Sequence, residues 1–261
     1  MSTGDLAALA ERLAREAGTL LIERFRGPAS GVATKSSAVD PVSDADRAAE
    51  AHIVGALSSV RPDDAILAEE GASAVGGSGL RWIIDPLDGT VNYLYGIPNW
   101  SVSIACADAG GTLVGCVHHP CANETFLAVR GGGASLNGRP LTVAGGVALD
   151  RALVATGFSY DLAVRSRWAE RMPALLSSVR DIRRAGSAAL DLCWVAAGRV
   201  DAYIERSVSP WDWMAGALVV SEAGGEVVEL GATDDEPFGV VAARPGLAEP
   251  LGDLMRDLRT R

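Results

Sequence analysis

The stretch "RWIIDPLDGTVNYLYGIPNW", residues 81–100, sets an apolar run directly before two aspartates. The run Trp82–Ile84 is typical of a buried strand, and the Asp-Pro and Asp-Gly pairs after it predict a turn. Asp85 and Asp88 then have two interpretations. They are ordinary turn residues whose side chains bind nearby backbone groups, or they are carboxylates that hold a cation at the end of a sheet. The rest of the chain decides between the two.

The composition is that of a globular protein with an acidic surface. The chain has 261 residues, of which 48% are hydrophobic and 21% charged, so it is long enough for a sizeable core. The formal net charge of -10 disfavours nucleic acid or an anionic membrane as a partner, because both need a basic face. An anionic substrate remains compatible with this charge where metal ions reverse it locally.

The sequence contains no recognisable targeting or membrane segment. The first residues lack the basic and apolar regions of a secretory signal, and no apolar run reaches the about 18 residues of a membrane span. Cys106, Cys116, Cys121 and Cys193 lie in apolar surroundings without a paired framework, which is typical of free thiols in a reducing compartment. We therefore expect a cytoplasmic protein that binds no membrane.

Hydrophobic periodicity predicts two halves that differ in their strand pattern. Helices are expected near residues 5–25, from Ser43 onward, and near 164–178, 187–197, 212–223 and 246–259. Short β-rich runs between 101 and 129 predict an antiparallel meander. Other strands are expected near 66–68, 152–156, 201–204, 226–230 and 238–242. Strand–helix alternation in the second half implies layered α/β structure, so we expect halves 1–147 and 148–261 joined tightly as one unit.

Acidic residues gather at the ends of the predicted elements. The six carboxylates are Asp46, Glu69, Glu70, Asp85, Asp88 and Asp212. Each has a local structural interpretation, such as a capping partner for Asp46 or an N-cap for Asp212. Together they repel one another, so their crowding favours a bound cation. Mg²⁺ prefers carboxylates and waters and usually binds jointly with substrate phosphates, and two or three such ions promote displacement at phosphorus.

The turn after Asp88 adds an anion-binding element. Gly89 and Thr90 are expected to present backbone N–H groups at the start of a short helix, where an anion is favoured. The Thr90 hydroxyl is expected to hold a water beside Glu70. On this interpretation the aspartates face a cation, and the glycine lets a phosphate approach.

Several motifs carry a family resemblance. "WIIDPLDGTVNYLYGIPNWSVSIA" resembles the first signature of the inositol monophosphatase family, Asp-Pro-x-Asp-Gly-Thr-x-Asn-aromatic, and "WDWMAGALVVSEAGGEV" resembles the second. "AEEG" is similar to the paired-glutamate motif, "KSSAVDPVSDAD" to the loop-and-aspartate segment, and "RRAGSAALDLCWVAAGRVDAYIE" to the stretch that shapes the substrate pocket. The resemblance covers nearly the whole chain in the family's order and spacing.

The resemblance implies a magnesium-dependent, lithium-sensitive phosphomonoesterase with a layered αβαβα sandwich, usually a homodimer. It implies two or three Mg²⁺ ions on these ligands: Glu69, Asp85, the Leu87 carbonyl, Asp88, Asp212 and, through water, Asp46. It assigns water activation to Glu70 and Thr90, phosphate binding to Asp88, Gly89 and Thr90, and contacts with the alcohol hydroxyls to Ala188, Glu205 and Asp212. Lys35 is expected on a mobile loop that closes over the metals.

Three positions depart from the usual pattern and leave the substrate open. Met214 replaces a small residue, Tyr93 replaces the commoner Phe, and Ser209 stands where animal members often have His. The first candidate substrate is myo-inositol 1-phosphate. Histidinol phosphate, fructose 1,6-bisphosphate, adenosine 3',5'-bisphosphate and a biosynthetic sugar phosphate remain alternatives. So does a regulatory, partner-binding protein on a phosphatase scaffold, although the intact acids argue against it.

Overall fold

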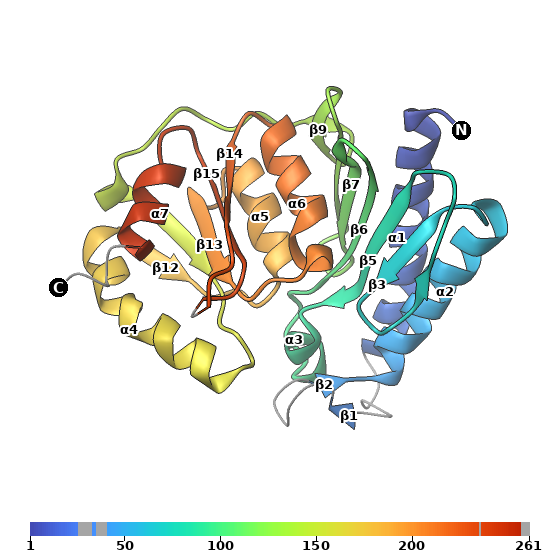
Figure 1. Ribbon diagram of the computed structural model, residues 1–261, viewed down its shortest axis with the longest axis horizontal. Helices are drawn as coiled ribbons and strands as arrows, with labels where there is room; N and C mark the ends of the chain where they lie inside the picture. Colours follow the sequence, from blue (N-terminus) through green and yellow to red (C-terminus); the bar gives the residue numbers. More distant parts are fainter. Residues whose placement is uncertain (26–32, 35–40, 235, 257–261) are drawn as a thin grey trace.

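The computed structural model describes residues 1–25, 33–34, 41–234 and 236–256 and has alternating helix and sheet layers (Figure 1). The helices are α1 (Thr3–Phe25), α2 (Asp44–Val60), α3 (Thr90–Leu94), α4 (Leu162–Ser178), α5 (Ala188–Ala196), α6 (Pro210–Glu222), α7 (Ala248–Arg256) and the 3-10 turn η1 (Leu149–Arg151). Among these described helices, none is long and apolar enough to cross a membrane.

One sheet has eight strands and the other has five. The eight-stranded sheet contains β3 (Ala65–Ala68), β4 (Ser73–Ala74), β5 (Arg81–Asp88), β6 (Ser101–Asp108), β7 (Gly111–His119), β8 (Glu124–Val129), β9 (Gly133–Leu136) and β10 (Arg139–Pro140), in the order β10-β9-β8-β7-β6-β5-β3-β4. Strands β6, β7 and β8 pair antiparallel, which confirms the predicted meander. A separate pair is formed by β1 (Ala33–Thr34) and β2 (Pro41–Val42).

The five-stranded sheet mixes parallel and antiparallel pairs. It contains β11 (Leu153–Thr156), β12 (Asp181–Arg183), β13 (Ala202–Arg206), β14 (Glu226–Leu230) and β15 (Gly239–Ala243), in the order β12-β11-β13-β15-β14. Strands β12, β11 and β13 run parallel, while β15 is antiparallel to both of its neighbours. The sequence did not predict β12, because three residues with one apolar side chain give no periodic signal.

The layers confirm the αβαβα sandwich that the sequence predicted. Helices α1 and α2 cover one face of the eight-stranded sheet, α5 and α6 lie between the two sheets, and α4 and α7 cover the outer face of the second sheet (Figure 1). Strand β5 carries apolar side chains on both of its faces because helices cover the sheet on both sides. Trp82 and Ile84 join the core beneath α1 and α2, whereas Ile83 joins the core around α5 and α6. Successive strand residues point to opposite faces, so a continuous apolar run is what a doubly covered strand needs.

Strand β5 does not end where the apolar run ends. Asp85 pairs with Ser103 and Asp88 with Ser101, so β5 carries one more residue than β6 over this interval. Such a bulge bends a strand and redirects its side chains, and Pro86 within it has no N–H for the ladder. The predicted turn at Asp85 is therefore wrong in detail. The strand runs through a bulge to Asp88, because Ser101 supplies the pairing beyond it.

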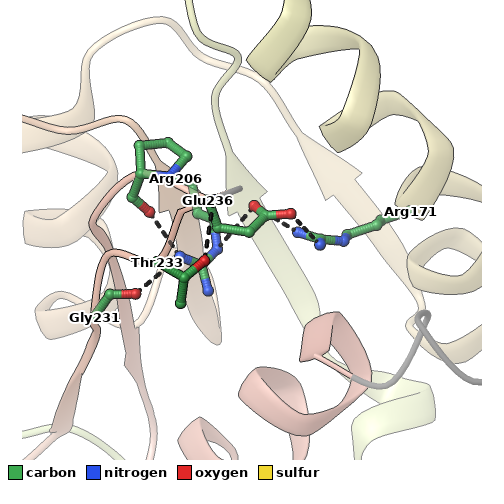
Figure 2. A network of polar contacts seen from close by, with 6 residues as sticks. Arg171, Arg206, Gly231, Thr233 and Glu236 are labelled. Carbon is green, nitrogen blue, oxygen red and sulfur yellow. Dashed lines mark hydrogen bonds and ion pairs between the residues drawn. The ribbon is translucent and has the colours of Figure 1, made fainter.

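A buried ion-pair network joins α4 and the end of β13 to residues that lie between β14 and β15 (Figure 2). Arg171 on α4 forms a bidentate pair with Glu236, and both side chains are nearly buried. Arg206 donates to the Pro237 carbonyl over 2.7 Å and lies 3.6 Å from the Glu236 carboxylate. The Glu236 N–H donates to the Thr233 hydroxyl over 3.1 Å. Removing one partner of such a buried pair would leave an uncompensated charge. Through Arg206, the last residue of β13, the network therefore holds the end of this strand in place.

Close packing of β7 against α6 gives a first prediction. A Cβ at Gly115 would lie 2.5 Å from the Ala215 carbonyl oxygen on α6, so Gly115→Ala forces the helix away from the sheet. We expect the free energy of unfolding in urea to fall by about 1–3 kcal/mol. The control is Gly55→Ala on α2, where a Cβ meets nothing within 4 Å. It should raise stability by roughly 0.5–1 kcal/mol, and equal stabilities of the two variants would contradict this packing.

Candidate active site

Buried carboxylates from separate segments approach one another where β3 and β5 end. Asp85 is 2% exposed, and its Oδ1 accepts the Leu87 N–H over 2.9 Å. Burial raises the pKa of Asp85 well above its usual value, and the negative charges of Glu69, Asp88 and Asp212 raise it further. The acids that are far apart in the sequence therefore lie within electrostatic reach of one another.

Asp88 connects the end of β5 to the beginning of α5. Its Oδ2 accepts the Ser187 hydroxyl over 2.6 Å and the Ala189 N–H over 2.8 Å. Ser187 is the N-cap of α5, and its Oγ accepts the Leu190 N–H over 3.3 Å. Burial raises the pKa of Asp88 to about 6, although the bonds from Ser187 and Ala189 lower it. A helix N-terminus favours negative charge, so α5 stabilises this carboxylate.

Asp212 lies in the first turn of α6 but is not its N-cap. The helix begins at Pro210 with Ser209 as the N-cap, and the Asp212 carboxylate accepts the Ser209 N–H over 2.7 Å. Proline is favoured at the first helical position, which explains why the helix begins before the aspartate. Burial raises the pKa of Asp212 well above its usual value, and Glu69 and Asp88 add to this effect.

Asp46 joins a helix cap to Thr90. It is fully buried and forms the expected capping box of α2, in which its Oδ2 accepts the Ser43 N–H over 2.9 Å. Its Oδ1 accepts the Thr90 hydroxyl over 2.9 Å, and that hydroxyl also lies 3.1 Å from the Leu87 carbonyl. Because the Thr90 hydroxyl donates its proton here, its oxygen is left to accept a hydrogen bond, for example from water.

Glu50 holds the paired glutamates and was missed by the sequence analysis. On α2, with 7% of its surface exposed, it accepts the Glu70 N–H over 2.8 Å and the Ala72 N–H over 3.1 Å. It thereby fixes the turn that carries Glu69. One signal was available, because Glu50 lies three residues before Ile53 on the apolar face of the helix, where a charge needs a partner.

A polar cavity of about 500 Å³ opens beside these acids. Of the residues predicted to form the site, six line it: Glu69, Asp88, Gly89, Ala188, Glu205 and Asp212. Five others, Asp46, Glu70, Asp85, Leu87 and Thr90, lie outside its lining. Lys35 lies outside the described residues. No sequence motif indicated that residues 156–161 and 207–208 also line the cavity.

A further part of the cavity wall is built around Glu205. A Cβ at Gly157 would lie 2.0 Å from its Oε2, so only glycine leaves room for this carboxylate. The Tyr203 hydroxyl donates to it over 3.1 Å. Burial raises the pKa of Glu205 to about 7, against the lowering effects of Arg184 and Tyr203. This wall offers hydrogen-bond acceptors to a polar ligand.

A layered sandwich with clustered acids at strand ends and helix N-termini, opening on a polar cavity, defines a hydrolase of phosphate monoesters. The comparisons agree. Residues 4–257 match the model of the Inositol monophosphatase family, and the chain belongs to this family.

Named relatives and solved structures cover nearly the full length. The Mycobacterium tuberculosis inositol-1-monophosphatase SuhB is 41% identical over 265 residues, which cover 94% of this chain and 91% of the relative. The Pseudomonas aeruginosa Nus factor SuhB is 43% identical over 228 residues, which cover 85% and 84%. The crystal structure of extragenic suppressor protein suhB from Bartonella henselae superposes with a TM-score of 0.88 at 36% identity, covering 96% of this chain and 98% of that one.

The acid cluster fits the chemistry of magnesium, on which the family generally depends. Within the described parts of the chain, no three His, Cys, Asp or Glu side chains converge as a complete ligand set. Mg²⁺ does not require one, because waters and substrate phosphate complete its coordination. All candidate donors are oxygens, and a cation would relieve the repulsion that raises the pKa values of Asp85 and Asp212.

Proposed function

We propose that this protein is a magnesium-dependent phosphatase of a small polyol or sugar phosphate, with myo-inositol 1-phosphate as the first candidate. The observation that carries the proposal is the set of acidic side chains that line the cavity. Glu69, Asp88 and Asp212 line it and suit metal ions and phosphate, and Glu205 also lines it and suits hydroxyl groups. A volume of about 500 Å³ is within the range of small-molecule sites.

Mg²⁺ would be held by the acids at the ends of β3 and β5. Glu69, Asp85 and the Leu87 carbonyl would bind one ion, and Asp85, Asp88 and Asp212 a second, with Asp46 contributing through water to a third. When bound, such ions lower the pKa of a coordinated water and neutralise charge on the phosphate and on the leaving oxygen.

The chain around Gly89 would bind the phosphate. Gly89 has φ +99, a conformation that disfavours other residues, and a Cβ there would lie 3.1 Å from the Gly186 carbonyl oxygen. Its N–H and that of Thr90 would donate to phosphate oxygens. Glycine therefore allows the close approach of the Gly186 segment to this turn.

Glu70 and Thr90 would position the attacking water. The Thr90 hydroxyl donates to Asp46, which leaves its oxygen to accept a hydrogen bond from one O–H of the water. The Glu70 backbone is fixed by Glu50, and the Glu70 carboxylate would take the one proton that the water loses as the nucleophile forms. Glu205 and Ala188 would contact the leaving alcohol.

Two kinds of alternative follow from this proposal. Histidinol phosphate, fructose 1,6-bisphosphate, adenosine 3',5'-bisphosphate and a biosynthetic sugar phosphate would use the same chemistry, and Ser209 lines the cavity where it bears on this choice. A regulatory role with a partner is favoured by one observation, the name Nus factor of the Pseudomonas aeruginosa relative. A phosphate-release assay over a panel of phosphorylated polyols, sugars and nucleotides separates these possibilities.

Activity should require magnesium and Asp88. We expect Asp88→Asn to abolish phosphate release, because the amide cannot replace a carboxylate ligand that also abuts the phosphate. Its thermal stability should change little, since the amide oxygen still accepts the bonds that Ser187 and Ala189 donate. Phosphate release is measured with and without added Mg²⁺. Full activity after exhaustive chelation would contradict the metal assignment.

The paired glutamates should respond differently to substitution. Glu70→Gln keeps the size of the side chain but cannot take a proton, so kcat should fall by about 10²–10⁴-fold with KM little changed. Glu69→Gln should instead weaken magnesium binding, so that added Mg²⁺ partly restores its rate. The measurement is a magnesium titration of kcat for both variants. Rescue of Glu70→Gln but not of Glu69→Gln would show that the two roles are reversed.

We also propose that the protein is a cytoplasmic homodimer, a proposal that the family resemblance supports. Light scattering of the purified protein should give a mass near twice the 27.0 kDa of one chain. A mass near that of a single chain across the micromolar range would contradict it.

A further inference from the structure

Asp191 is a buried carboxylate in the cavity wall to which no part of the proposed mechanism assigns a role. It lies in the first turn of α5, is 1% exposed, and lines the cavity together with Glu205. Its Oδ1 is shielded from solvent and accepts no hydrogen bond from the residues that the structure describes. Burial raises the pKa of Asp191 well above its usual value, and Glu205 and Asp88 add to this, whereas Arg184 opposes it.

A buried acceptor without a donor is unfavourable. Leaving one unsatisfied costs about 1–3 kcal/mol, so such groups are rare unless a ligand or water completes them. Asp161, another acid of the cavity wall, is different, because its Oδ1 already accepts the Val164 N–H over 2.9 Å as the N-cap of α4. Of the two acids, Asp191 is therefore the one whose bonding is incomplete without a ligand.

Arg184 is the one cationic side chain among the described residues that line the cavity. A Cβ at Gly186 would lie 2.7 Å from its Nη1, so the glycine, with φ +97, lets the guanidinium lie against the chain. Its charge lowers the pKa values of both Asp191 and Glu205, which places all three groups in one electrostatic neighbourhood. The wall thus offers an acceptor and a donor within electrostatic reach of each other.

This pairing has a defined chemical preference. A hydroxyl group donates one hydrogen bond and accepts others, so it satisfies a carboxylate and a guanidinium at once. A methylene group satisfies neither. The wall therefore favours a hydroxylated alcohol over an apolar one.

We propose that Asp191 is a specificity-determining residue, which together with Arg184 binds a hydroxyl of the alcohol part of the phosphate ester. This inference rests on the proposed function and extends it, because it assigns to a residue outside the predicted site the selection of hydroxylated substrates. Asp191 contacts neither the phosphate nor the reacting oxygen in this scheme.

The test compares two esters that differ only in their hydroxyl groups. Dissociation constants of myo-inositol 1-phosphate and cyclohexyl phosphate are measured by calorimetry, with Ca²⁺ in place of Mg²⁺ to keep the esters intact. D191L has a similar volume but no acceptor, so it should reduce the preference for the inositol ester about tenfold while the affinity for cyclohexyl phosphate stays within about twofold. R184M, at an exposed side chain, should reduce the preference in the same direction.

D161N is the matched control. It removes one negative charge from the same cavity but keeps an oxygen to cap α4, so it should leave the ratio of the two affinities unchanged. Thermal melts verify that each variant folds, and if D191L does not fold, R184M carries the test. An unchanged ratio in the folded variants, or an equal loss of affinity for both esters, would overturn the inference.

A separate measurement distinguishes this inference from the proposed function. Release of phosphate from the inositol ester is assayed in Mg²⁺ with the unchanged protein. If the protein shows the expected binding ratios but releases no phosphate, the proposed function fails and the role of Asp191 in hydroxyl recognition stands.

Discussion

The hydrogen bonds between Asp88 and the N-terminus of α5 are the contact on which the site depends. Asp88 ends β5 of the eight-stranded sheet, and Ser187 and Ala189 begin a helix of the middle layer. The cavity lies between these elements, so its shape follows from this junction. The bulge in β5 makes the junction possible, because it redirects the strand after Asp85 and brings Asp88 to the helix.

The site concentrates buried charges that destabilise one another, and capping contacts hold them there. Asp46 serves the cap of α2 and Asp212 that of α6, while both belong to the acid cluster. The two interpretations of these acids from sequence were therefore not exclusive. A carboxylate that completes a helix cap is fixed in position, and a fixed carboxylate is what a metal site requires. Burial without a cation raises the pKa values of Asp85 and Asp212, which is the disadvantage that a bound ion removes.

The sequence predicted the features whose pattern lies within a single element, and it missed those that depend on residues distant in the chain. Periodic apolar residues predicted the long helices and the meander, because each pattern lies within one element. The strand β12 and the bulge were missed, since both are defined by pairing with residues distant in the chain. The acids at strand ends were predicted from motifs, but Glu50 and Asp191 were not. Their roles come from which groups surround them after folding, and no local pattern encodes this.

The middle layer explains where such a fold can vary its substrate. Helices α5 and α6 bury apolar faces against both sheets and also direct their N-termini toward the cavity, so contacts that stabilise the fold and contacts that shape the site are the same. Changing Ser187 or Asp212 would disturb a helix cap together with the chemistry. Asp191 and Arg184 carry no such double role, because neither caps a helix in the described structure. Substitutions at these two positions can therefore change which alcohol is selected, while the residues proposed to bind metal and phosphate stay the same.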